Sequence, residues 1–278
     1  MKTLPLSILA SLAFASVGVA QEITYSTTFD TLPSGISLSG ATSATPGVTG
    51  VSGDWVTTDQ NQDDSVLSDS SPLAQYVGDQ WAIMGGAAVP NAGTGPSQTS
   101  SELWYPVQLA HNFQISMEFD ITTSSVAYPN DDTFGMTFRN TSGGLLFQVL
   151  FKPDSSSPSS TLDAEWNNGG SEQSTDISIS RNSVYTLNID GSLDDGTFQT
   201  AISESTTSTE GTFDGTLTPG ATLGEAGVTW VEQSPGTYGS NAIAFNNYEA
   251  VPEPSVDAFL LGSAGMGLAW LLRRRRMA

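Results

Sequence analysis

Apolar and polar residues alternate with a period of two along much of the chain between residues 21 and 250. The clearest run is Phe113-Gln114-Ile115-Ser116-Met117-Glu118-Phe119-Asp120-Ile121. In an extended strand, successive side chains point to opposite faces, so its aromatic and aliphatic residues share one face and its polar residues the other. This pattern is typical of an antiparallel sheet that covers a hydrophobic core on one side.

Other short segments show the same alternation, with Gly, Pro, Asn, Asp and Ser between them. They predict strands at residues 24–29, 80–84, 102–109, 134–138, 145–151, 162–166, 184–189, 197–202, 227–231 and 242–248. A Thr141-Ser142-Gly143-Gly144 turn predicts a β-hairpin between two of them. Residues 35–53, 59–71 and 87–101 are rich in turn-forming residues. The sequence therefore predicts an all-β domain of two packed antiparallel sheets.

The order of these strands resembles the concanavalin A-like jelly roll, which is related in shape to laminin G domains. The resemblance lies in an opening Thr28-Phe29-Asp30 segment, the central run at 113–121, the hairpin, and a closing Ala242–Tyr248 strand. It implies an antiparallel two-sheet jelly-roll sandwich over residues 21–250. A shared fold does not imply a shared activity.

The C-terminal tail has a different character. Val251-Pro252-Glu253-Pro254-Ser255 precedes an apolar segment at 258–272, which is followed by Arg273, Arg274, Arg275 and Arg276. The apolar segment is shorter than the roughly 20 residues that span a bilayer comfortably. The basic cluster is expected to hold the end of the chain in the cytoplasm.

This tail closely resembles the PEP-CTERM sorting signal of exported bacterial proteins. The resemblance implies that an exosortase, a membrane-embedded cysteine transpeptidase, recognises the motif and removes the tail. It also implies membrane anchoring through the C-terminal segment before cleavage, and a cell-surface or matrix location afterwards. An ordinary C-terminal membrane anchor is the alternative.

The N-terminus agrees with export. Lys2 precedes an apolar stretch that ends in Val17-Gly18-Val19-Ala20, which predicts signal-peptide cleavage between Ala20 and Gln21. The expected organisation is therefore a signal peptide at 1–20, the sandwich at 21–250 and the sorting signal at 251–278.

The amino-acid composition excludes several classes of binding partner and of active site. The chain has 29 acidic and 8 basic residues, with a formal net charge of −21. Such a surface repels nucleic acid, so nucleic-acid binding is excluded. The absence of cysteine excludes a thiol nucleophile and a cysteine-ligated zinc site. The single histidine, His111, has no companions for a nucleophilic triad.

Carboxylates on one strand face are the candidates for catalysis, because retaining glycosidases use two of them about 5–5.5 Å apart. Glu118 with Asp120, or Asp163 with Glu165, could supply such a pair, and Trp166 could stack on a sugar. Thr122 stands where a further glutamate would complete a longer pattern. The simpler interpretation of Glu118 and Asp120 is the solvated face of a half-buried strand.

Asn130, Asp131 and Asp132 form a candidate calcium site, because Ca²⁺ prefers clustered oxygen ligands. Turn formation explains these residues equally well.

The sequence predicts a non-catalytic, adhesive or structural surface protein with weak glycan or calcium binding. The alternatives are a secreted glycoside hydrolase or lyase on the same fold, and a laminin G-type protein-binding module.

Overall fold

The computed structural model describes residues 25–27, 56–57, 65–68, 81–85, 101–122, 132–154, 156, 160–205, 209–231 and 241–252. The described elements are β1 (Tyr25–Thr27), β2 (Val56–Thr57), β3 (Ser65–Ser68), β4 (Trp81–Gly85), β5 (Ser101–Leu109), β6 (Asn112–Thr122), β7 (Thr133–Asn140), β8 (Leu145–Pro153), β9 (Thr161–Asn167), β10 (Gln173–Ser180), β11 (Tyr185–Ser192), β12 (Thr197–Glu204), β13 (Thr209–Thr216), β14 (Leu223–Val231) and β15 (Ala242–Pro252).

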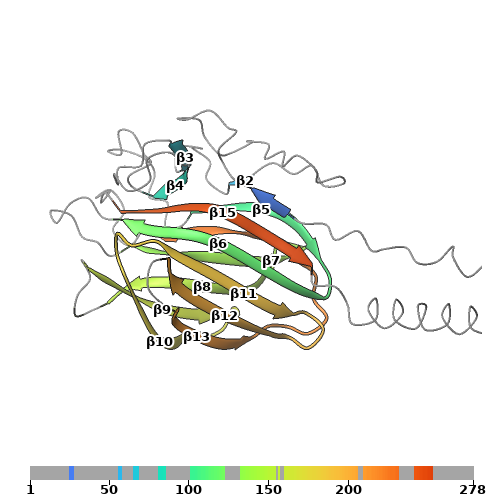
Figure 1. Cartoon of the computed structure of the whole chain (residues 1–278). Coiled ribbons are helices and arrows are strands. Elements are labelled where there is room, and N and C mark those ends of the chain that lie inside the picture. Colours follow the sequence, from blue (N-terminus) through green and yellow to red (C-terminus); the bar gives the residue numbers. More distant parts are fainter. Residues whose placement is uncertain are drawn as a thin grey trace, which may run out of the picture.

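These strands form two antiparallel sheets that pack face to face (Figure 1). The eight-stranded sheet has the order β13-β12-β11-β6-β15-β4-β3, with β1 also paired to β15. The seven-stranded sheet has the order β10-β9-β8-β7-β14-β5-β2. The predicted all-β jelly-roll sandwich is thereby confirmed.

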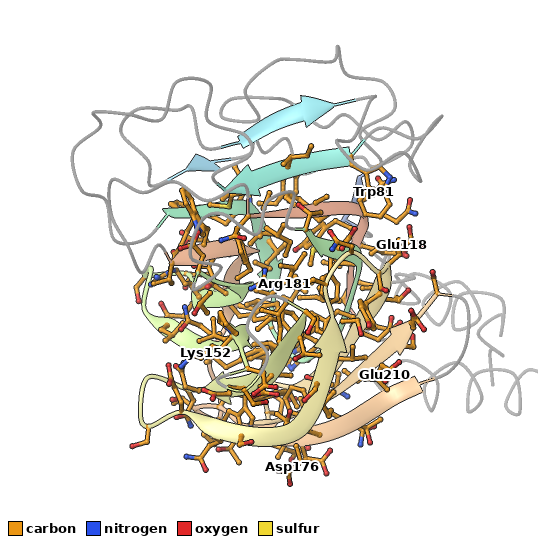
Figure 2. The ribbon with its side chains drawn as sticks, turned by 90° about the vertical axis from the view of Figure 1, so that its left-hand side faces the viewer. Trp81, Glu118, Lys152, Asp176, Arg181 and Glu210 are labelled. Carbon is orange, nitrogen blue, oxygen red and sulfur yellow. The ribbon has the colours of Figure 1, made fainter. Side chains whose placement is uncertain are left out.

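Aromatic side chains connect the sheets across the core, where side chains fill the space between the ribbons (Figure 2). The Phe119 ring of β6 stacks on Phe151 of β8, with centroids 4.8 Å apart. Phe147 of β8 stacks on Phe138 and on Phe198 of β12, each at 4.2 Å. Such pairs contribute about 0.5–1.5 kcal/mol each beyond the apolar area that they bury.

The predicted hairpin is confirmed. The Asn140 side chain accepts hydrogen bonds from the backbone N–H groups of Ser142 and Gly144, both at 2.9 Å, and Gly143 has φ = 80°. Only glycine adopts that left-handed conformation without steric cost, which explains the sequence of this turn.

Four strands lie where the alternation predicted none. β3 lies within the predicted turn-rich stretch at 59–71, and no strand was predicted at the positions of β2, β10 and β13. The closing strand is longer than predicted, because β15 continues to Pro252, which pairs with Phe113. In the part of the chain that the structure describes, no helix has the length and apolarity required to cross a membrane.

Candidate functional site

The two predicted catalytic pairs lie on different sheets, so they do not form a common site. Glu118 and Asp120 are in β6 of the eight-stranded sheet. Glu118 accepts a hydrogen bond from Asn247 Nδ2 at 2.6 Å. Asp120 has no exposed surface, which corrects the expectation of a solvated position. The reason is that this end of the outer face carries a second apolar cluster around Trp81 and Ile83.

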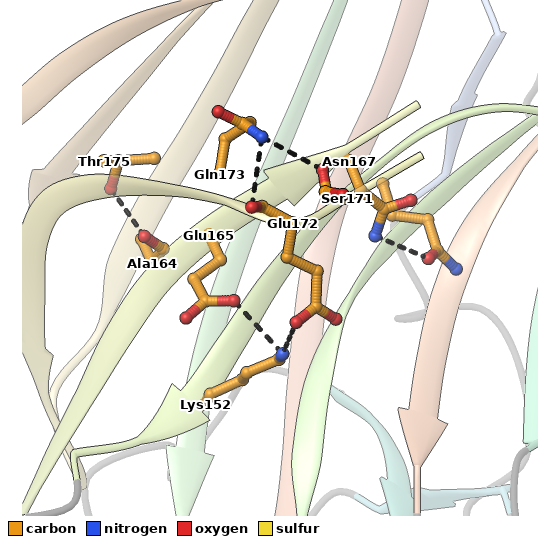
Figure 3. Close-up of polar contacts among 9 residues, drawn as sticks. Lys152, Ala164, Glu165, Asn167, Ser171, Glu172, Gln173 and Thr175 are labelled. Carbon is orange, nitrogen blue, oxygen red and sulfur yellow. Dashed lines mark hydrogen bonds and ion pairs between the residues drawn. The ribbon is translucent and has the colours of Figure 1, made fainter. Parts of the chain in front are cut away.

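Asp163 and Glu165 are in β9 of the seven-stranded sheet. Ser178 Oγ donates a hydrogen bond to Asp163 at 2.6 Å. The Lys152 ammonium lies between Glu165, at 3.1 Å, and Glu172 (Figure 3). Partial burial alone would lower the pKa of Lys152, but the hydrogen bonds to Glu172 and Glu165 raise it above its usual value. Both carboxylates of this pair are thus engaged in contacts that stabilise the sheet.

Of the candidate calcium ligands, Asn130 and Asp131 lie outside the described residues. Asp132 is 4% exposed and accepts hydrogen bonds from Trp230 Nε1 at 3.1 Å and Asn241 Nδ2 at 3.5 Å. Burial lowers the pKa of the neighbouring Arg181 to about 10, and the charge of Asp132 opposes that shift. Asp132 therefore belongs to a buried polar cluster that joins the two sheets. Within the described ranges no three or more acidic, histidine or cysteine side chains gather as a metal site.

The first two residues of the predicted sorting motif are part of the fold. Val251 and Pro252 pair with Gln114 and Phe113 at the end of β15. Glu253, Pro254 and Ser255 lie outside the described residues, as do Ala20, Gln21 and Arg273–Arg276.

A groove of about 640 Å³ crosses β6, β11, β12 and β13 near their ends and reaches Trp166 of β9. Its polar walls come from two rows of side chains that run across the strands on the outer face of the eight-stranded sheet. The first row contains Asp190, Gln199 and Asp214, and Gln114 of β6 continues it in register. The second row is Asn112, Ser192, Thr197 and Thr216.

Two equivalent hydrogen bonds organise the first row. Gln114 Nε2 donates to Asp190 Oδ1, and Gln199 Nε2 donates to Asp214 Oδ1, both at 2.9 Å. All four side chains are exposed. Each glutamine holds its carboxylate in a defined orientation while the second carboxylate oxygen remains available to a ligand.

The row between these two faces the core and contains glycine in alternation with phenylalanine. A Cβ atom on Gly191 would lie 2.2 Å from the Phe113 ring, and one on Gly215 would lie 2.1 Å from the Phe198 ring. Both glycines line the groove together with Phe198. The half-buried Trp166 ring meets Phe198 edge to face at 5.4 Å. The groove is thus lined mainly by carboxylate, amide and hydroxyl groups, and its aromatic part is the half-buried Trp166 ring beside the buried Phe198.

Sequence reasoning missed Asp190, Gln199 and Asp214. A usable signal was present, since Gln114 and Gln199 are outward positions of predicted strands and Asp190 directly follows the predicted strand at 184–189. Their alignment depended on strand order and register, and Asp214 lies in a strand that was not predicted. Of the residues singled out from the sequence and described by the structure, only Trp166 lines this groove.

No protein-family model matches the sequence, and no curated protein is significantly similar to it. Several solved structures resemble the chain in shape. The CBM2 module of the evolved Dit protein of Lactobacillus casei BL23 phage J-1 has a TM-score of 0.46 and 12% identity, over 83% of this chain and 96% of that chain. The seed lectin of Lotus tetragonolobus has a TM-score of 0.43 and 10% identity, over 72% of this chain and 100% of that chain.

Lectin I-B4 of Griffonia simplicifolia, in a metal-free form, has a TM-score of 0.40 and 12% identity, over 70% of this chain and 98% of that chain. These likenesses are in the arrangement of strands. The chemistry of the groove is what bears on function.

Proposed function

We propose that this chain is an exported, surface-associated protein without catalytic activity that binds glycans in the groove across β6, β11, β12 and β13. The observation that carries the proposal is the groove itself, with its two polar rows and Trp166. Sugar-binding sites commonly combine aromatic surface, which covers the apolar side of a pyranose ring, with polar groups that orient its hydroxyls.

The polar groups suit hydroxyl ligands. Asp190 and Asp214 can only accept hydrogen bonds when ionised, whereas Asn112, Ser192 and the threonines can donate and accept. Sugar hydroxyls do both, so either row can pair with them. The glutamine hydrogen bonds hold both carboxylates before a ligand arrives, which reduces the entropic cost of binding.

The spacing of Asp190 and Asp214 does not fit the carboxylate pair of a retaining glycosidase. Asp190 and Asp214 are separated by β12, so two interstrand distances place their backbones about 9.5 Å apart. A glutamine on the neighbouring strand orients each of the two side chains in the same way. Retaining glycosidases need about 5–5.5 Å, which is roughly half of this backbone spacing, whereas about 9.5 Å is the upper limit of the range for inverting enzymes.

We further propose that an exosortase-type system sorts the protein to the cell surface or an extracellular polysaccharide matrix. The supporting features are the tail motif that starts at Val251, the arginines at 273–276 and the signal sequence before Gln21. Asn130 and Asp131 are the proposed calcium ligands, because Ca²⁺ prefers clustered oxygen ligands.

A glycan array probed with the full chain tests the binding proposal. We expect binding to at least one class of glycan, and a roughly 10- to 100-fold loss in Asp190→Asn or Asp214→Asn, because hydrogen bonds to charged groups contribute about 1.5–3 kcal/mol. Asp163→Asn, on the other sheet, is the matched control and should leave binding unchanged. Parallel arms with Ca²⁺ and with chelator report calcium dependence. Absence of binding to every glycan would overturn the proposal.

A further inference from the structure

The first row of the groove has an internal repeat. Gln114 and Asp190 form one unit, and Gln199 and Asp214 form a second unit with the same residue types, the same donor and acceptor atoms and the same 2.9 Å distance. The second unit lies two strands further across the sheet than the first. The four residues are successive cross-strand partners on β6, β11, β12 and β13, in the order Gln114, Asp190, Gln199 and Asp214. The pitch of the repeat is therefore about 9.5 Å, perpendicular to the strands.

The repeat carries negative charge that no cationic residue of the groove offsets. Among the residues that the structure describes, neither lysine nor arginine lines the groove, and the glutamine donors are neutral. Asp194 and Asp195 add two carboxylates in the turn between β11 and β12, where Asp194 contacts His111 and Asp195 accepts a hydrogen bond from Ser192 Oγ. An anionic ligand would face repulsion along the whole row.

We propose that the groove selects linear glycans that carry free amino groups, and that such a chain lies across the strands with one amino group at Asp190 and another at Asp214. This inference rests on the glycan-binding function proposed above and specifies its ligand class. An ammonium group only donates hydrogen bonds and an ionised carboxylate only accepts them, so the two are complementary. The resulting charge-assisted bonds are about twice as strong as those between neutral groups.

Two identical subsites also favour a polymer over a monosaccharide. Once one amino group is bound at Asp190, the chain presents the next to Asp214 at a high effective concentration. Longer oligomers should therefore bind more tightly than the monosaccharide even though each subsite makes the same contacts. Uronate-containing glycans bring carboxylates to the acidic row, which repels them.

The test compares glucosamine oligomers with N-acetylglucosamine oligomers of equal length and with galacturonate oligomers, by calorimetry on the full chain. N-acetylation removes the positive charge and leaves the sugar backbone unchanged. We expect the glucosamine oligomers to bind at least tenfold more tightly than the acetylated oligomers. Galacturonate oligomers should not bind. The preference should weaken at high salt and disappear above the pKa of the ligand's amino group.

A charge-matched pair of variants separates the subsites from the general attraction of an acidic protein for a polycation. The groove variant carries Asp190→Asn and Asp214→Asn together, which removes two charges from the groove. The control variant carries Asp163→Asn and Asp176→Asn together, which removes two charges from the other sheet. Asp176 is exposed at φ = 57°, a conformation that asparagine tolerates well. The groove variant should lose the preference for amino groups, and the control variant should retain it.

Equal losses in both variants, or equal affinity for acetylated and free oligomers, would overturn the amino-sugar inference while glycan binding itself stands. Failure of all three oligomers to bind, together with a blank glycan array, would overturn the glycan-binding function and this inference with it.

Discussion

Phe113 of β6 lies directly over Gly191 of β11 on the core side of the eight-stranded sheet, and the two residues are cross-strand partners. A Cβ on Gly191 would lie 2.2 Å, 2.4 Å and 2.9 Å from three atoms of the phenyl ring. Phe113 is fully buried, so its ring has no solvent space into which it can move. The ring therefore takes the volume that a side chain at residue 191 would fill.

Gly191→Ala should consequently destabilise the protein. Overpacking of this kind costs about 1–3 kcal/mol, because the ring or the backbone must shift. Alanine also reduces the conformational entropy of the unfolded chain, which stabilises the folded protein by about 0.4–1 kcal/mol. We expect the steric cost to dominate, since two of the three contacts are more than half an ångström shorter than the 3.0 Å below which Cβ contacts are essentially never found.

A double-mutant cycle with Phe113→Leu isolates the clash, because leucine removes the ring atoms that the new methyl group would meet. Gly191→Ala should cost less in the Phe113→Leu background than in the parent, with a coupling energy of about 0.5–3 kcal/mol. Urea unfolding followed by circular dichroism provides the free energies, with an unchanged m-value as the check on two-state behaviour.

Gly170→Ala is the control, since its Cβ would meet only Asn168 Oδ1 at 3.5 Å, an ordinary contact. It should change stability by less than about 0.5 kcal/mol. The proposed clash with the Phe113 ring would be refuted if the Gly191→Ala protein were as stable as the parent. It would also be refuted if the stability changes of the two single substitutions simply added up in the double mutant.

Two further predictions concern buried polar groups. Asp132→Ala should reduce the free energy of unfolding by about 3–5 kcal/mol, because Arg181 loses a countercharge and Trp230 loses an acceptor inside the fold; Asp132→Asn should cost less. A loss below about 1 kcal/mol in urea unfolding of the alanine variant would contradict this role. Burial raises the pKa of Tyr248 well above the ordinary tyrosine value of 10.0. Its contribution to stability is therefore complete below pH 10.0 and is lost at higher pH, where the unfolded chain ionises first. Tyrosinate absorbance of Tyr248 should rise only with alkaline unfolding, and Tyr248→Phe should move the unfolding midpoint to higher pH; an ionisation of Tyr248 that precedes unfolding would refute this.

The alternation along Phe113–Ile121 was sufficient to predict β6 and the direction of its faces. Each core-facing residue of that run is buried, as the period of two requires. The fold class followed from the same local rule, because strands with one apolar face are stable only when a second sheet covers that face.

The rule failed where glycine occupies core-facing positions. In β13, Gly211 and Gly215 take the inward places of an ordinary strand, and the Ile177 side chain and the Phe198 ring fill the space that they leave. The apolar volume is present, but residues on other strands supply it. A window that moves along the chain therefore finds no hydrophobic period in β13, and β10 is missed because most of its residues are polar.

The groove depends on the order and register of strands. Gln114, Asp190, Gln199 and Asp214 each look like ordinary outward residues in the sequence. Pairing of β6 with β11, β11 with β12 and β12 with β13 brings them into one row. Alternation is a local property, set by the geometry of one extended chain, so it can be predicted from neighbouring residues. Alignment across strands is set by hairpin turns and long-range packing, and a one-residue slip in any pair would turn this row toward the core.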